Sequence, residues 1–355
     1  MNEEVETIEQ DQELARYSRQ ILFQPIGQEG QRKLLASRVT LIGCGALGSV
    51  LANTLVRAGV GFLRIVDRDY LELNNLQRQT LFTEDDIAAN LPKAEAARRR
   101  LERINSSVTI EAVVTDATHR NIEHLCKEAY LLLDGTDNFE TRFLINDVAV
   151  KTDRPWVYGA CVASIGMAMP ILPHKTPCLR CISEEAPPPH MNPTCDTAGV
   201  LGPVVNMVAA HQAMEAMKIL MGRLDVVNRR LLRFDAWQGS VTMLDMQKAF
   251  DQTDCLCCKK NNFEYLEGKF SSSATTLCGR DAVQITPTIG VTIDFAAIAD
   301  KIRNVTQIEP KFNAFMLKAR VEKHEFTVFA DGRAIVKGTN KPEEARTLYA
   351  KYVGA

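Results

Sequence analysis

The sequence has almost no net charge: 42 Lys and Arg residues oppose 44 Asp and Glu residues in a chain of 355, which leaves a formal charge of −2. Such a balance gives no electrostatic reason to expect binding to nucleic acid or to a membrane surface. We therefore expect neither as a partner. Small molecules and proteins with locally complementary charge are the expected ligands.

Long apolar runs are also missing. The first residues, Met-Asn-Glu-Glu-Val-Glu, are acidic and contain neither a basic leader nor an apolar segment, so we expect no secretory signal. The longest apolar stretch, about 200–221, contains His211, Gln212, Glu215 and Lys218, too many polar groups for a bilayer span. It predicts a buried helix instead, and we expect a cytoplasmic protein.

Internal repeats, low-complexity tracts and His-x-x-x-His pairs are absent as well, and the scattered histidines are interpreted as incidental. Hydrophobic residues make up 46% of the chain, as in an ordinary globular core. The length allows one large α/β domain and a smaller unit.

Ten cysteines are present, and in a reducing cytosol they are expected to stay thiols or to bind metal. Four of them form two Cys-x-x-Cys pairs, Cys178 with Cys181 and Cys255 with Cys258. Two such turns complete the four-sulfur shell that structural zinc prefers, so we predict Zn²⁺ here. Redox pairs or plain buried thiols are the alternatives. Cys257 could replace Cys258 only with a one-residue spacer, which strains the chelate.

Short apolar runs alternate with helical segments in the first half of the chain. The run at 39–42 is typical of a parallel strand buried on both faces. Similar runs recur at 62–66, 107–114 and 130–133. Segments with helical character lie at 13–36, 93–104 and 120–128. The alternation predicts an α/β fold with a doubly wound, Rossmann-like sheet.

The pattern changes beyond about residue 155. A Pro-rich stretch at 186–193 is expected to be a loop, a long helix follows Gly202, and a strand pair is expected around 231–246.

After about residue 262 we interpret a separate small α+β module. Its clearest element is a hairpin in which Asp331-Gly332 joins 326–329 to 334–337, because Asp-Gly suits a primed turn, and a helix at 341–352 follows. We therefore divide the chain into domains at 1–260 and 262–355.

Three glycines, Gly43, Gly45 and Gly48, follow the first predicted strand and open a helix. Backbone N–H groups and the positive helix end would then face an incoming phosphate. Asp67 lies 19 residues after Gly48 at the end of the second strand, where a carboxylate can accept hydrogen bonds from ribose hydroxyls. To this point NAD and ATP fit equally well.

Further motifs follow in order: Asn74-Asn75-Leu76-Gln77-Arg78-Gln79, Leu91-Pro92-Lys93 and Leu133-Asp134-Gly135-Thr136-Asp137-Asn138. With these, the chain resembles the ThiF/MoeB adenylyltransferases, relatives of the ubiquitin-activating enzymes, from about Arg16 to Cys258. The segments 16–21 and 198–203 also look like that family. The resemblance implies an enzyme that uses ATP to adenylate the C-terminal glycine of a ubiquitin-fold sulfur carrier ending in Gly-Gly, with release of pyrophosphate and later formation of a thiocarboxylate.

In the resembled family, the residues matching Asn75, Arg78, Lys93 and Asp137 bind ATP and its metal. The residue matching Arg19 reaches the phosphates from a neighbouring subunit, which implies a homodimer. The residue types suit these roles: Arg78 and Lys93 can neutralise the leaving pyrophosphate, and Asp137 can hold Mg²⁺.

The alternatives for these residues are plain. Arg78 and Lys93 could be solvated surface cations, and Asp134 or Asp137 could cap a helix. By the family pattern Asp137, rather than Asp134, is the metal-facing acid.

Cys195 lies between the Pro-rich stretch and the long helix, where a helix N-terminus would lower a thiol pKa. In the ThiF branch of the family the matching cysteine forms an acyl-persulfide link to the carrier. We predict a nucleophile, with a structural thiol as the alternative. Cys278 lies outside the resemblance and is expected to be a buried thiol.

Three other functions stay open. A nicotinamide-dependent oxidoreductase is supported only by the Gly-rich loop and Asp67. A tRNA-modifying dehydratase of the same superfamily is opposed moderately by the charge balance and the cysteine pairs. A non-enzymatic zinc adaptor would not require the phosphate-binding set. Residues 262–355 lack an obvious rhodanese loop, so we expect a separate sulfur donor, and the sequence does not identify the carrier or its pathway.

Overall fold

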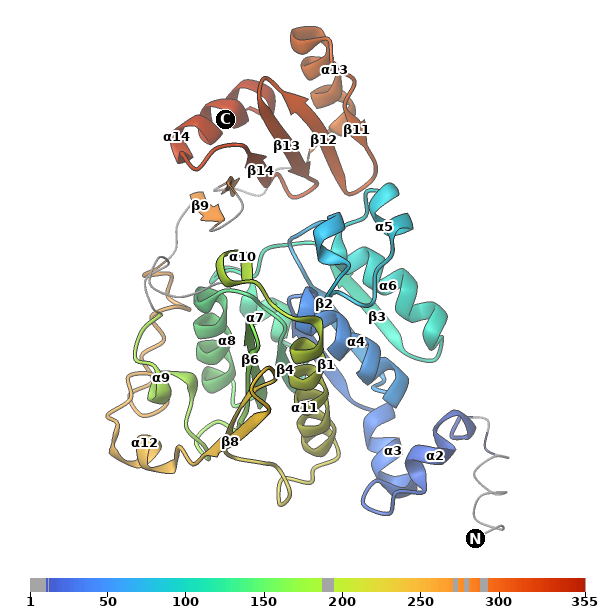
Figure 1. Cartoon of the computed structure of the whole chain (residues 1–355), viewed down its shortest axis with the longest axis vertical. Helices are drawn as coiled ribbons and strands as arrows, with labels where there is room; N and C mark the ends of the chain where they lie inside the picture. Colours follow the sequence, from blue (N-terminus) through green and yellow to red (C-terminus); the bar gives the residue numbers. More distant parts are fainter. Residues whose placement is uncertain are drawn as a thin grey trace.

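The computed structural model describes residues 11, 13–186, 195–270, 274–277, 281–287 and 293–354. Most of the predicted Pro-rich loop and Cys278 lie outside the described residues, so both predictions stay predictions. Two sheets organise the chain, one of eight strands and one of six. Figure 1 shows the larger unit in the lower part of the view and the C-terminal module above it.

The eight-stranded sheet has the order β3-β2-β1-β4-β5-β6-β7-β8. Five strands pair in parallel: β1 (Arg38–Ile42), β2 (Phe62–Val66), β3 (Thr109–Val113), β4 (Leu131–Asp134) and β5 (Trp156–Val162). Three antiparallel strands extend it: β6 (Ile165–Ile171), β7 (Leu231–Asp235) and β8 (Ser240–Leu244). The order reverses between β1 and β4, as in a doubly wound fold. The predicted Rossmann-like sheet is confirmed, with an antiparallel extension.

Helices cover both faces of this sheet. One core contains residues of α4 (Ala46–Ala58), α6 (Lys93–Ile104) and α11 (Gly202–Leu220). The other contains residues of α7 (Ile122–Cys126) and α8 (Phe139–Lys151). Leu41 belongs to the first core and its neighbour Ile42 to the second, because successive strand side chains point to opposite faces. Shorter helical segments are η2 (Leu73–Asn75), α5 (Glu84–Ala88), α9 (Leu179–Ile182), α10 (Cys195–Ala198) and α12 (Gln247–Gln252).

The N-terminal stretch is interrupted. Instead of one helix over 13–36, it forms η1 (Ala15–Tyr17), α2 (Ser18–Ile21) and α3 (Gly27–Leu35). Pro25 lies in the break, and Gly27 after it has a φ of 55°. A proline lacks the N–H of a helical hydrogen bond and disfavours helical conformation in the residue before it, which accounts for the break.

Helix α11 is buried on one face only. Met217 and Met221 are buried, whereas Met207 and Met214 are exposed, so the prediction of a buried helix holds for part of its surface. Although α11 is the longest of the described helices, neither it nor another described helix combines the length and the apolar character that crossing a membrane requires.

The C-terminal module is a six-stranded antiparallel sheet in the order β11-β12-β13-β14-β10-β9. Its strands are β9 (Ala274–Leu277), β10 (Ala282–Ile285), β11 (Lys311–Phe312), β12 (Met316–Val321), β13 (His324–Phe329) and β14 (Ala334–Lys337). The helices α13 (Phe295–Thr306) and α14 (Pro342–Tyr352) share one core with the sheet. The module is therefore the small α+β unit that was expected.

The predicted hairpin is present as β13 and β14. Its turn differs from the expectation, because Gly332 has a φ of 85° whereas Asp331 does not have a positive φ. The Phe329 N–H donates to the Arg333 carbonyl, which leaves three residues in the loop. A three-residue loop needs glycine at a single left-handed position, whereas the primed two-residue turn needs positive φ at both.

The module also packs against the larger unit. Ala282, Met316, Phe329 and Ile335 form a buried cluster with Tyr70, which follows β2. The module therefore lies beside the carboxyl ends of the parallel strands, above α5 in Figure 1. The division at 1–260 and 262–355 stays a prediction.

Candidate active site and metal centre

The loop between β1 and α4 touches the loop that follows β4. A Cβ on Gly48 would lie 2.0 Å from the Gly43 carbonyl oxygen, and a Cβ on Gly43 would lie 2.6 Å from that of Gly135. Gly43 also has a φ of 88°. Only glycine fits such approaches. The two loops meet where the strand order reverses, which is the place where doubly wound folds bind ligands.

Gly45 faces open space instead. The nearest atom to a Cβ built on it is Nε2 of Gln79, at 3.8 Å. No side chain caps the N-terminus of α4 at this point, so its first N–H groups can receive an anion. Gln79 is buried, and its Oε1 has no hydrogen-bond partner among the described residues. Because buried polar groups are normally paired, this atom beside Gly45 is available to accept a hydrogen bond from a ligand or water.

Asp67 ties the end of β2 to the glycine loop. Its Oδ2 accepts the Cys44 N–H at 2.6 Å, and its Oδ1 accepts the Asp69 N–H at 2.7 Å. Burial raises the pKa of the Asp67 carboxyl, while the nearby Lys93 ammonium acts to lower it. Each oxygen can accept a second hydrogen bond, so the carboxylate suits a ribose hydroxyl.

Lys93 begins α6 and points inward. Its Nζ lies 3.1 Å from Oδ2 of Asp69, and its side chain is only 5% exposed. The alternative that Lys93 is a solvated surface cation is therefore wrong. The sequence motifs did not predict Asp69 as a site residue, although it follows Asp67 by two positions; its contact with Lys93 identifies it. A buried cation of this kind can neutralise a phosphate.

Asn75 and Arg78 lie on the turn that begins with η2. Asn75 is buried, and its Oδ1 accepts the Glu72 N–H at 3.0 Å. Arg78 is half-buried and donates from Nη1 to the Asn74 carbonyl at 2.9 Å. A Cβ on Gly202 would lie 3.0 Å from the Gln77 carbonyl, so this turn packs on the start of α11.

The two acids after β4 differ in environment. Asp134 is fully buried and pairs with Nε of Arg142 at 3.0 Å, while its other oxygen accepts the Thr136 N–H at 2.9 Å. Asp137 is exposed at the sheet edge. Asp134 thus holds the loop in place, whereas the carboxylate of Asp137 is open to solvent, and its assignment to Mg²⁺ stays a prediction.

Arg19 lies far from the glycine loop of its own chain. It is exposed on α2, and the adjacent Gln20 donates to the carbonyl of Ala58 at the last residue of α4. The 13 residues of α4 place that end roughly 20 Å from the loop, at about 1.5 Å per residue. Within one chain Arg19 does not join the site, and its predicted role requires a second subunit.

Cys195 begins α10 and is partly buried. Its Sγ lies 3.4 Å from the carbonyl oxygen of Cys161 in β5. Burial raises the pKa of the Cys161 thiol to about 12, and the neighbouring Cys195 contributes a smaller increase. Cys161 therefore stays a neutral thiol near pH 7. Cys195 is the more exposed of the two sulfurs.

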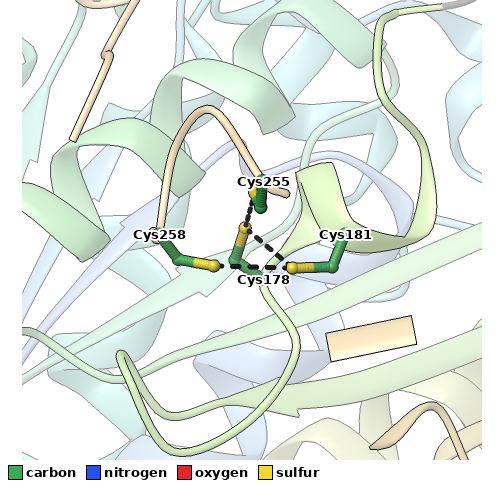
Figure 2. A group of neighbouring side chains, drawn as sticks. All are labelled: Cys178, Cys181, Cys255 and Cys258. Carbon is green, nitrogen blue, oxygen red and sulfur yellow. Dashed lines mark hydrogen bonds between the residues drawn. The ribbon is translucent and has the colours of Figure 1, made fainter. Parts of the chain in front are cut away.

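The four predicted zinc ligands come together. Figure 2 shows Cys178, Cys181, Cys255 and Cys258 pointing toward one another from two turns. Three of the sulfur–sulfur distances are 3.5, 3.6 and 3.8 Å. A tetrahedral ion with bonds of about 2.3 Å requires sulfurs about 3.8 Å apart, so the buried group fits zinc.

Cys257 takes a different direction. It is buried, and its Sγ accepts a hydrogen bond from Nδ2 of Asn146 at 3.3 Å. The Oδ1 of Asn146 accepts the Leu179 N–H at 2.8 Å. Asn146 thereby joins both cysteine turns to α8. The geometry supports Cys258 over Cys257 as the fourth ligand.

Comparison with known proteins identifies the family. The sequence model of the ThiF family matches residues 17–258, which is more than half of the chain. The chain belongs to the ThiF family. This confirms the resemblance seen in the order of the motifs.

Relatives of this ThiF-family chain carry informative names. The Bacillus subtilis sulfur carrier protein ThiS adenylyltransferase is 42% identical over 340 residues, which cover 96% of this chain and 99% of the relative. The Thermus thermophilus sulfur carrier protein adenylyltransferase is 37% identical over 67% of this chain and 89% of its own. The crystal structure of E. coli MccB with ATP is similar with a TM-score of 0.56 and 25% identity over 65% of this chain and 70% of its own.

Gln79→Leu tests whether the unpartnered amide serves a ligand. We expect unchanged or higher thermal stability, because no described hydrogen bond of Oε1 is lost, but weaker ATP binding. Gln212→Leu is the matched control: its buried Oε1 also has no partner among the described residues, but its Nε2 donates to the carbonyls of Asp134 and Val157. It should cost about 1–3 kcal/mol of stability. Melting curves and titration with a fluorescent ATP analogue measure both; normal ATP binding by Gln79→Leu would contradict the assignment.

Removal of the metal should lower the melting temperature, because the tetrad joins segments 77 residues apart. We expect about one zinc per chain by elemental analysis, retained in Cys257→Ser and lost in Cys258→Ser. Stability that is unchanged after verified loss of metal would show that the tetrad is not a structural clamp.

Proposed function

We propose that this enzyme uses ATP to adenylate the C-terminal glycine of a ubiquitin-fold sulfur carrier that ends in Gly-Gly. One observation carries the proposal. The glycine loop, Asp67 and the Lys93–Asp69 pair converge where the strand order reverses, in a chain 42% identical to a ThiS adenylyltransferase along nearly its whole length. The similar fold of MccB, of which there is a crystal structure with ATP, supports the choice of nucleotide.

The nucleotide is proposed to lie along the carboxyl edge of the parallel strands. Its ribose hydroxyls would donate to Asp67, and its phosphates would meet the N–H groups at Gly45 and the start of α4. Asn75 and Gln79 line the same turn and supply amide groups. Binding of this kind needs no large movement, because Asp67 already fixes the loop through the Cys44 N–H.

The reaction joins two anions and therefore needs cations. The carrier carboxylate attacks the α-phosphorus of ATP, a P–O bond forms, and pyrophosphate leaves from the opposite side. The buried ammonium of Lys93, beside Asp69, and the guanidinium of Arg78 are proposed to neutralise the phosphate oxygens. The carboxylate of Asp137 suits Mg²⁺, which when bound would withdraw charge from the phosphates.

Sulfur is proposed to enter through Cys195. A separate donor protein would transfer sulfur to this thiol as a persulfide. The terminal sulfur attacks the carbonyl carbon of the acyl-adenylate, AMP leaves with the electrons of the C–O bond, and an acyl disulfide forms. A thiol reductant then attacks the Cys195 sulfur and expels the thiocarboxylate, and a second thiol frees Cys195 from the resulting mixed disulfide, so that the two thiols leave as a disulfide. Cys195 is only partly buried, unlike the neighbouring Cys161, and this supports access from the carrier.

The functional unit is proposed to be a homodimer. Gln20, the neighbour of Arg19, contacts the end of α4 that lies roughly 20 Å from the glycine loop of the same chain, so Arg19 would act on phosphates from a second subunit. The exposed Met207 and Met214 of α11 offer apolar surface for the contact. Zinc would fix the edge of the carrier groove without chemical work. A reducing cytoplasm suits the four thiol ligands.

Exchange of labelled pyrophosphate into ATP tests the adenylation. We expect exchange that depends on a carrier ending in Gly-Gly and disappears when the two glycines are deleted. Asp137→Ala should abolish exchange, because the phosphates lose their metal, whereas Asp300→Ala, an exposed acid on α13, should have no effect. Exchange that persisted in Asp137→Ala would remove this residue from the mechanism, and NADH binding without ATP binding would support the oxidoreductase instead.

Cys195→Ser separates the two half-reactions. We expect it to keep pyrophosphate exchange, because adenylation uses no thiol. It should lose the covalent carrier adduct that intact-mass measurement is expected to detect in the wild type. Cys161→Ser, a change at the neighbouring buried sulfur, is the control and should keep the adduct. An adduct that survives in Cys195→Ser would make Cys195 a structural thiol.

A further inference from the structure

The segment from Asp67 to Asn75 lies between the candidate nucleotide site and the C-terminal module. Its regular structure consists of η2 at its end and one bridge between Tyr70 and Pro92. Asp67 and Asp69 bond to groups of the nucleotide site. Arg68, Tyr70 and Glu72 contact the module instead. The segment therefore needs support from outside itself to keep one conformation.

The module holds this segment at three successive alternate positions. Nη1 of Arg333 donates to the carbonyl of Arg68 at 3.3 Å. Nζ of Lys318 lies 3.7 Å from the ring centroid of Tyr70, which is buried beneath the module. Lys337 forms an ion pair with Glu72. The module thus reaches every second residue of this stretch, through the backbone carbonyl of Arg68 and through the side chains of Tyr70 and Glu72.

The Glu72 contact leads directly to a nucleotide-binding candidate. Glu72 and Asn75 form a reciprocal capping box, in which Oδ1 of Asn75 accepts the Glu72 N–H and the Glu72 side chain accepts the Asn75 N–H. Lys337 holds the same carboxylate from the module side. The ion pair therefore fixes the turn that presents Asn75 to the nucleotide.

Other contacts reach the neighbouring parts of the site. Nδ2 of Asn313 donates to the carbonyl of Asn90 at 2.8 Å, three residues before Lys93. Nε2 of Gln284 donates to Asp116 at 2.7 Å, and Asp116 pairs with Arg68 at 3.2 Å.

We propose that the C-terminal module is a positioning element of the nucleotide site in its own chain, with Lys337 as a positioning residue that acts through Glu72 on Asn75. The inference rests on the proposed function. The module orders the segment before ATP binds, so the entropic cost of ordering it does not reduce the binding free energy of ATP. A module that served only to dock a partner would not need to bury Tyr70 or to pair with Glu72.

Lys337→Met tests the proposal in the full-length chain. We expect about a tenfold rise in the Kd and KM for ATP, since an ion pair to a positioned carboxylate is lost, with the KM for the carrier, the zinc content and the melting temperature little changed. Lys337→Arg should restore ATP binding. The matched control is Lys351→Met, which removes the exposed pair with Glu322 at 2.8 Å inside the module and should leave ATP binding unchanged.

Glu72→Gln approaches the same pair from the other side and keeps the test decisive if Lys337→Met loses stability. Its effect on ATP affinity should not add to that of Lys337→Met in the double variant. Unchanged ATP affinity in both single variants, or full additivity, would overturn the proposal. A wild-type protein that bound no ATP would instead overturn the proposed function, so the two failures are distinguishable.

Discussion

Close contact between two backbone loops sets the geometry of the whole nucleotide site. The loops after β1 and β4 approach so closely at Gly43, Gly48 and Gly135 that a Cβ at any of these positions would collide with a backbone atom. One loop leads into α4 and the other carries Asp137. Because the loops touch, groups that suit phosphates and groups that suit a cation lie at one point. The buried Asp134–Arg142 pair keeps the second loop there.

Irregular segments flank this rigid centre, and each is held by a contact between distant parts of the chain. The cysteine tetrad joins two turns, which Asn146 also ties to α8. The C-terminal module holds the segment after β2 through Lys337, Lys318 and Arg333. Both devices order segments that have few regular hydrogen bonds. These contacts fix the positions of irregular segments beside the sheet and need no additional parallel strands.

Local patterns predicted much of the fold. The run at 39–42 became β1, the amphipathic 93–104 became α6, and the Cys-x-x-Cys pairs came together as expected. The predictions depended on spacings within one element or one turn. The prediction of one continuous N-terminal helix was wrong, because Pro25 interrupts it, and the hairpin has a three-residue loop instead of the expected two-residue turn. Asp69 and Gln79 were missed because only their burial and partners, and not their spacing, distinguish them.

The sequence by itself determined the strands at 39–42 and 62–66, the helix at 93–104, the zinc-type ligand set and the family, because each follows from residue types at short or ordered spacings. Tertiary structure alone decided that Asp134 forms an ion pair with Arg142 and that the buried Lys93 pairs with Asp69. It also decided that the module packs on the segment after β2. Those outcomes depend on which distant surfaces meet. A pattern read along the chain does not contain that information, because burial and charge pairing arise only when the elements pack.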